Sequence, residues 1–123
     1  MFNYVEFEKW IDDVIGSGLL DEIVAVNFNL YEESEDNTWA VQFICADTFD
    51  DEDEDWACDE IFSSDENMYI WTEDGGWEKA LDTASSNIRM YLEKGRYATK
   101  LKKFEAVGVG FVDGDIDLVF VKN

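Results

Sequence analysis

Six consecutive carboxylates, residues 50–55 (DDEDED), are the densest group of chemically active side chains in this sequence. Trp56 follows them directly, and Asp59 and Glu60 extend the run. Carboxylates can bind metal ions, act as the acid and base of a hydrolase, or hold arginine side chains through paired hydrogen bonds. A run of like charges is also typical of a solvated loop that keeps a protein soluble, so that interpretation stands beside the others.

The spacing of these carboxylates does not match a calcium-binding loop. Such a loop needs acids at alternate positions, a glycine at the sixth position and a glutamate at the twelfth. Counted from Asp50, the sixth residue is Asp55, and counted from Asp113 it is Leu118. We therefore expect no specific metal site, and no other pattern in the chain indicates a cofactor.

Catalysis is also disfavoured. The chain has no histidine, which removes the commonest general base. Cys58 is followed by Asp59 and Glu60, and a thiol beside neighbouring acids is a poor nucleophile. Gly108 and Gly110 lack the third glycine of a dinucleotide-binding loop. Among 30 Asp and Glu some pair always lies close together, so paired carboxylates indicate little, and we expect no enzyme activity.

The negative charge is concentrated in one part of the chain. Residues 1–75 hold 23 Asp and Glu against one base, Lys9, whereas residues 76–123 hold 7 acids against 8 bases. Such crowding raises self-repulsion, which suggests a use as an electrostatic lure for a strongly basic partner. Direct binding of nucleic acid is disfavoured at a net charge of −21. The bases between residues 89 and 103 are expected to pair with acids elsewhere in the fold or to balance the acidic edge of the sheet.

Hydrophobic periodicity predicts the elements that position these residues. Apolar steps of three and four predict one helix over residues 5–15 and another from Trp77 to a glycine cap at Gly95. Alternation predicts strands over residues 23–31 and 38–46, shorter strands at 56–62 and 68–72, and two C-terminal strands joined by a turn at Asp113-Gly114. Gly108 and Gly110 share one face of their strand, which would let a helix lie close to the sheet.

These elements predict a single α+β domain over residues 1–123. We expect a mostly antiparallel sheet of about five to six strands with two main helices packed on one face. The sequence starts without a secretory signal and has no long apolar run, so we expect a cytoplasmic protein that does not enter the membrane. Cys45 and Cys58 are then expected to be reduced and buried, with a disulfide between them as the alternative.

In its size, acidity and α+β organisation the chain resembles the small acidic immunity and inhibitor proteins of bacterial toxins, above all of nuclease toxins. The resemblance covers the whole chain but includes no sequence motif. It implies a tight one-to-one complex that blocks a toxin domain. Nucleases bind phosphate and present Lys and Arg around their active sites, so an acidic partner meets them with complementary potential.

The residues expected to contact a basic protein partner form two groups. The first comprises Asp50, Asp51, Glu52, Asp53, Glu54, Asp55, Trp56, Asp59 and Glu60, and the second comprises Glu32, Glu33, Glu35 and Asp36. An alternative is a nucleic-acid mimic of the anti-restriction or anti-CRISPR type, although such a mimic needs charges at even, duplex-like spacing rather than a clump. A further alternative is an acidic adaptor for a basic protein.

Overall fold

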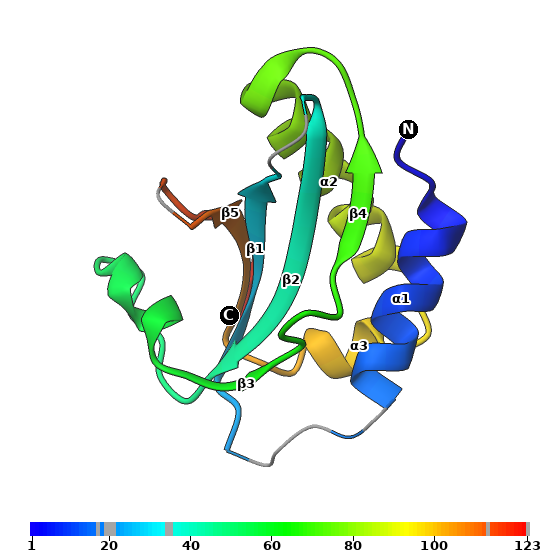
Figure 1. The fold of residues 1–123 in the computed structure, drawn as a ribbon. Helices are drawn as coiled ribbons and strands as arrows, with labels where there is room; N and C mark the ends of the chain where they lie inside the picture. Colours follow the sequence, from blue (N-terminus) through cyan, green and yellow to red (C-terminus); the bar gives the residue numbers. More distant parts are fainter. Residues whose placement is uncertain (17, 19–21, 34–35, 113, 123) are drawn as a thin grey trace.

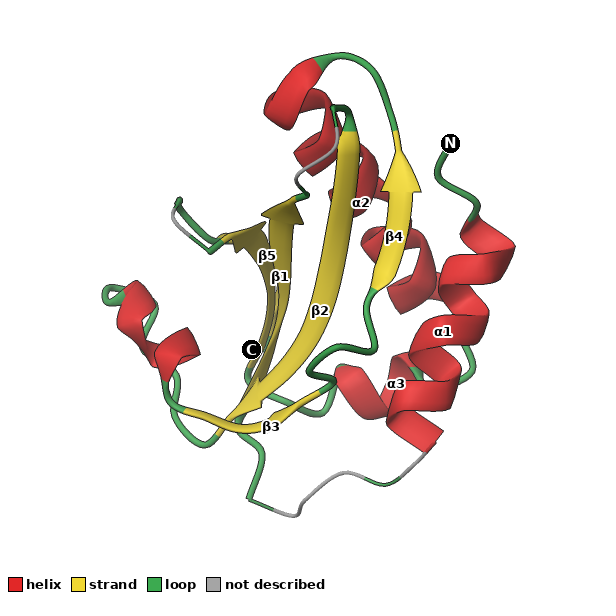
Figure 2. Cartoon of the chain, in the orientation of Figure 1, coloured by secondary structure: helices red, strands yellow, loops and turns green. Residues whose placement is uncertain are grey.

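A mixed six-stranded sheet with helices on one face organises the described part of the chain (Figure 1). The computed structural model describes residues 1–16, 18, 22–33, 36–112 and 114–122. The predicted fold class, α+β with a mostly antiparallel sheet and two main helices on one face, is confirmed. Figure 2 shows the α-helices on one side of the strands and a short helical segment, residues 54–58, on the other.

Both predicted helices form. They are α1 (Tyr4–Gly16) and α2 (Gly76–Lys94), and a single helical turn, α3 (Ala98–Leu101), follows α2. The Asn3 side chain accepts the Glu6 N–H at 3.1 Å and so caps the start of α1. On its inner face α1 buries five apolar side chains: Phe7, Trp10, Ile11, Val14 and Ile15. Their steps of three and four put all of them on one side, which is why this segment is a helix lying on a sheet.

The strands are β1 (Ala25–Glu32), β2 (Thr38–Ala46), β3 (Glu60–Ser63), β4 (Tyr69–Thr72), β5 (Ala106–Phe111) and β6 (Asp117–Val121). Their order is β3-β2-β1-β5-β6, and β4 also pairs with β2. β1 and β5 are parallel neighbours, whereas all other pairs are antiparallel. Two parallel strands end at the same edge of a sheet, so the last residues of β1 and β5 lie together.

The core lies between the sheet and the helices. Alternate residues of β1 and β2 face this layer, and Phe28 pairs with Phe43 across the two strands with their ring centroids 5.3 Å apart. From α2, Ile88 and Tyr91 reach the same cluster and are each only 1% exposed. The Tyr91 hydroxyl donates a 2.6 Å hydrogen bond to the Asp12 carboxylate, which ties α2 to α1.

The prediction of a strand from residue 56 is wrong in its first half. Glu54–Cys58 forms a 3-10 helix, η1, and β3 begins only at Glu60. Asp53 precedes η1 in an extended conformation, and its side chain accepts the Asp55 N–H at 3.0 Å, as an N-cap residue does. The aromatic and apolar composition of this stretch indicates burial, but it does not distinguish a short strand from a short helix.

The predicted role of Gly108 and Gly110 is also wrong. Both glycines lie on the face of the sheet opposite α1 and α2, in register with Asn27 and Asn29 of β1. A Cβ on Gly110 would lie 2.3 Å from the backbone oxygen of Asp115, so the space serves the connection between β5 and β6 rather than a helix. That connection runs from residue 112 to 116, longer than the two-residue turn predicted, and Asp113 of the predicted turn lies outside the described residues.

Burial of the Cys45 thiol predicts a loss of stability at alkaline pH. Burial raises its pKa from 9.0 to about 12. The unfolded chain therefore releases this proton near pH 9 while the folded chain keeps it, so stability is complete below pH 9 and falls from there to about pH 12. We expect the free energy of unfolding to fall by about 1.4 kcal/mol per pH unit from this group alone.

Urea denaturation between pH 8 and 11 measures this effect. Cys45→Ala should show a shallower decline than the wild type, whereas Cys58→Ala, which alters an exposed thiol, should keep the wild-type decline. Burial and the hydrogen bond to Asp12 raise the pKa of Tyr91 as well. Tyr91 therefore contributes equally to the pH dependence of stability in all three proteins. Identical pH dependence in all three proteins would contradict the assignment.

Candidate partner-binding surface

The acidic segment, defined here as residues 50–60, lies on the face of the sheet opposite α1 and α2. Trp56 of η1 is 4% exposed and packs on a floor of three small side chains, Ala25, Ala46 and Ala106, from β1, β2 and β5. The Phe49 ring meets the indole edge-on with its centroid 5.4 Å away. The small floor lets the indole come close to the sheet, so the run of carboxylates is seated on the fold.

Hydrogen bonds hold the segment in place. The Glu54 carboxylate accepts the N–H of Ile116 from the connection between β5 and β6. Asp50 accepts the N–H of Glu52 at 2.9 Å, and Asp53 accepts that of Asp55 at 3.0 Å. These bonds keep the backbone compact despite the repulsion among neighbouring carboxylates.

The carboxylates of the acidic segment are exposed, and none of them forms a salt bridge within the described residues. The single salt bridge there joins Lys9 to Asp13 of α1 at 3.3 Å. Other carboxylates of α1 also have internal partners, since Glu8 accepts the Tyr4 hydroxyl and Asp12 that of Tyr91. In the acidic segment the structure gives no such partner to the carboxylates of Asp51, Glu52, Asp55, Asp59 and Glu60. The charge on this surface is therefore available to another molecule.

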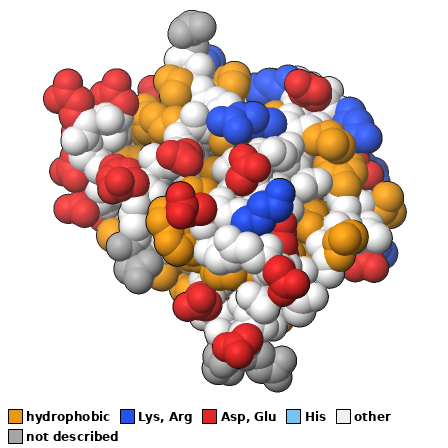
Figure 3. Space-filling view, turned by 90° about the horizontal axis from the view of Figure 1, so that it is seen from above, with side chains coloured by type: hydrophobic (Ala, Val, Ile, Leu, Met, Phe, Trp, Pro, Cys, Tyr) orange, Lys and Arg blue, Asp and Glu red, His pale blue; other side chains and the backbone are white. Residues whose placement is uncertain are grey.

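Lys122 lines a hollow together with Asp50 and Asp51 without forming a salt bridge, whereas the bases between residues 89 and 103 lie elsewhere and do not pair as predicted. None of the bases between residues 89 and 103 forms a salt bridge with a described acid. Lys94 lies 4.8 Å from the centroid of the Tyr4 ring, and Arg96 lies 5.5 Å from that of Tyr97. Figure 1 shows α3 and η1 on opposite sides of the sheet. In Figure 3 red carboxylates are densest at the left, the side where Figure 1 shows η1.

The second predicted group lies at the other end of β1. Glu32 is exposed at the end of the strand, and Glu33 and Asp36 lie in the connection to β2, while Glu35 is outside the described residues. β1 begins at the floor beneath Trp56 and ends at Glu32, so the two groups are about 23 Å apart along the strand. The structure therefore does not bring them together into one patch.

Trp56 was predicted to contact the partner, and its burial bears on that role. Because the side chain is 4% exposed, a partner could touch it only if η1 left the sheet. Its observed contacts make it a support for the carboxylates around it. The sequence shows an aromatic residue beside charges, which is consistent with an interface anchor but favours a core residue by a small margin.

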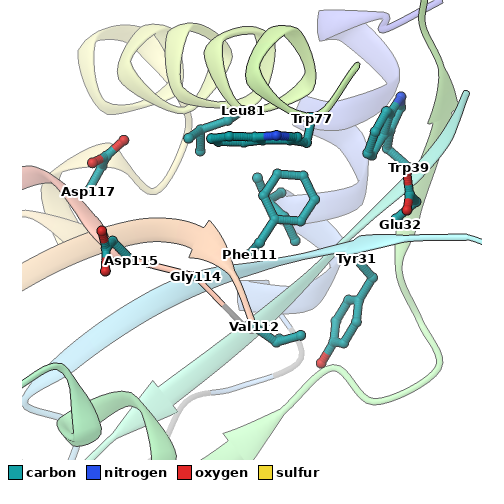
Figure 4. A pocket seen from close by; sticks show the side chains of 11 residues that line it. Tyr31, Glu32, Trp39, Trp77, Leu81, Phe111, Val112, Gly114, Asp115 and Asp117 are labelled. Carbon is teal, nitrogen blue, oxygen red and sulfur yellow. The ribbon is translucent and has the colours of Figure 1, made fainter.

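A groove that the sequence did not reveal lies at the edge where β1 and β5 end (Figure 4). Trp77, at the start of α2, and Phe111, at the end of β5, form its aromatic part. Glu32, Asp115 and Asp117 contribute carboxylates to its lining. These residues are far apart in the sequence, and the one available signal was an aromatic residue directly after the Gly75-Gly76 break.

Comparison of the chain with protein-family models, with curated proteins and with solved structures finds no match in any of the three. The functional interpretation therefore depends on the charges and contacts described above. In the described part of the chain, no three or more Cys, Asp or Glu side chains are grouped so as to hold a metal ion. None of the helices described here has both the length and the apolar character needed to cross a bilayer.

The two cysteines are free thiols in different surroundings, which makes a prediction. Cys45 is buried in β2, whereas Cys58 is exposed at the end of η1, so the expectation that both are buried is wrong for Cys58. We expect a maleimide to modify one thiol per molecule in the native protein and two in urea, with intact mass as the measurement. Cys58→Ala should take up no reagent until it unfolds. Equal modification of both thiols in the native state would contradict the structure.

Proposed function

We propose that this chain is an acidic inhibitor of the immunity-protein type, which binds and neutralises a basic toxin in the cytoplasm of the cell that makes both. The favoured target is a nuclease. One observation carries the proposal: the carboxylates of the acidic segment are exposed, form no salt bridge with a described base, and lie on the face of the sheet opposite α1, α2 and α3.

The seating of the segment supports this function. A flexible acidic tail would lose conformational freedom on binding, whereas carboxylates already ordered on η1 lose less. Trp56 and the bond from Glu54 to the Ile116 N–H supply that order. Ordered carboxylates can then form bidentate pairs with arginine side chains that a nuclease uses to hold phosphate.

Long-range attraction supports the same conclusion. The chain has a net charge of −21, and an excess of one sign on one face speeds the encounter with an oppositely charged protein. Rapid capture matters for an inhibitor because a free toxin damages its producer. The attraction falls at high ionic strength, so association should slow as salt is added.

A one-to-one inhibition assay tests the proposal. Proteins encoded beside the gene for this chain are purified and assayed for cleavage of RNA and DNA, with and without this chain. We expect one of them to be basic and to lose its activity at one molar equivalent. Cleavage that persists at a tenfold excess of this chain would overturn the inhibitor proposal, and inhibition of unrelated DNA-binding proteins would favour the nucleic-acid mimic instead.

A further inference from the structure

The groove at the ends of β1 and β5 combines an aromatic surface with carboxylates. Its volume is about 860 Å³, enough for a long side chain and the adjoining backbone of a partner. Figure 4 shows the Trp77 indole lying over the Phe111 ring, with Asp115 and Asp117 to one side and Glu32 near Trp39 on the other. An occupant would therefore meet aromatic faces between negative charges.

The aromatic residues form a continuous surface. The Trp77 and Phe111 rings are 6.3 Å apart between centroids and nearly perpendicular at 89°, and Phe111 meets Trp39 at 5.9 Å. Trp39 is 2% exposed and forms the floor, whereas Trp77 is 58% exposed. An exposed tryptophan beside an open groove is typical of a contact residue rather than of a core residue.

The carboxylates decide which kind of occupant fits. Glu32, Asp115 and Asp117 are exposed, and none of them forms a salt bridge with a described base. Anionic ligands are thereby disfavoured, and a purely apolar occupant would leave these charges unpaired at its edge. A cation with an extended planar face can stack on the aromatic rings and also pair with the carboxylates.

A second, smaller hollow of about 360 Å³ shares Trp77, Leu81 and Asp117 with the groove. Ser85 lines it and is 6% exposed, and its hydroxyl has no hydrogen-bond partner among the described residues. Glu78 and Asp82 add carboxylates, and Arg89 is the base in this lining. Carboxylates therefore line both of the hollows that share Trp77.

We propose that the groove binds an arginine side chain of a basic protein partner, with the guanidinium stacked on Trp77 and paired to carboxylates of the rim. Guanidinium is planar, stacks on aromatic rings and donates in paired geometry, whereas the lysine ammonium is a compact point charge. This inference rests on the proposed function for the basic character of the partner. The bond from Glu54 to the Ile116 N–H joins the acidic segment to the connection that carries Asp115, so one partner can cover both.

The test compares two synthetic peptides of equal charge, deca-arginine and deca-lysine, binding to the intact chain in titration calorimetry. Three variants are used. The groove variant is Trp77→Ala, its control is Ile70→Ala, which removes an equally exposed apolar side chain on β4, and the quartet variant carries Asp50→Asn, Asp51→Asn, Asp53→Asn and Asp55→Asn. Circular dichroism and urea denaturation confirm that each variant is folded.

We expect the wild type and Ile70→Ala to bind deca-arginine about fivefold more tightly than deca-lysine. Trp77→Ala should lose this preference while its affinity for deca-lysine stays unchanged. In the NMR spectrum of the wild type, the indole N–H resonance of Trp77 is the one that is missing from Trp77→Ala. This resonance should shift as deca-arginine is added until binding is saturated. Equal affinities for the two peptides in the wild type, or an unchanged preference in Trp77→Ala, would overturn the groove assignment.

The quartet variant separates this inference from the proposed function. It should bind both peptides more weakly by the same factor and keep the preference for arginine. If the quartet variant binds like the wild type while Trp77→Ala loses the preference, the groove assignment stands and the role given to the acidic segment fails. If the quartet variant binds both peptides more weakly and Trp77→Ala keeps the preference for arginine, the groove assignment fails and the acidic segment keeps its role.

Discussion

Under the proposed function, the quartet variant will associate with the basic partner at least about tenfold more slowly than the wild type, because it removes four charges from the surface proposed to attract that partner. Asparagine matches aspartate in shape and is as good an N-cap, so Asp53→Asn keeps the start of η1. Removing repulsion among adjacent carboxylates leaves the stability unchanged or slightly higher. The dissociation rate should rise as well, since direct pairs with arginine are lost.

Stopped-flow association at several salt concentrations measures this effect with the partner found in the inhibition assay. The logarithm of the rate should fall less steeply with ionic strength in the quartet variant than in the wild type. A control variant carries Glu6→Gln, Asp13→Asn and Glu93→Gln, which remove exposed charges from the helices. It should associate nearly as fast as the wild type. Equal slowing in both variants would show that net charge matters and that its position on the acidic segment does not.

Trp56→Ala will lower the free energy of unfolding by about 3 kcal/mol, the usual loss when a large buried aromatic side chain is removed. The indole is 4% exposed, and its floor of alanines cannot close over the space it leaves. The variant keeps every charge, so its association with the partner should stay fast. Its complex should dissociate sooner, because η1 must then be ordered on binding.

Urea denaturation and dissociation kinetics test this second prediction. Trp56→Phe serves as the matched control, since a smaller ring keeps part of the packing on Ala46 and should cost about 1 kcal/mol. The Phe49 ring should still meet it. If Trp56→Ala unfolds at the same urea concentration as the wild type, the acidic segment is not seated as described.

Local periodicity predicted most of the fold. The helix faces and the alternation in β1 and β2 follow from burial of one side of each element, and these patterns lie within a few residues of sequence. The parallel pairing of β1 with β5 does not follow from local periodicity, because the two strands are separated in the chain by β2, β3, β4 and α2. The wrong role for Gly108 and Gly110 has the same origin, since their alternation gives a shared face without telling which face carries the helices.

The candidate site was predictable only where it is continuous in sequence. The carboxylates of residues 50–55 form one run, whereas the groove joins Trp77 to Phe111 and Asp115 across the fold. No periodicity relates these positions, and their meeting depends on where β1 and β5 end. The 3-10 form of η1 was equally hard to predict. It depends on the N-cap bond in which the Asp53 side chain accepts the Asp55 N–H, and not on any apolar pattern.

The three-alanine floor under Trp56 has a consequence for synthesis on the ribosome. Ala25 and Ala106 are adjacent in the sheet but about 80 residues apart in the chain, and such distant pairing forms late. A nascent chain that has emerged from the ribosome as far as the acidic segment still lacks β5, which supplies Ala106 to the floor under Trp56. Translation must therefore proceed through β5 before the surface can take its final shape, and a ribosome stalled earlier yields an acidic product in which η1 has no complete floor to pack on.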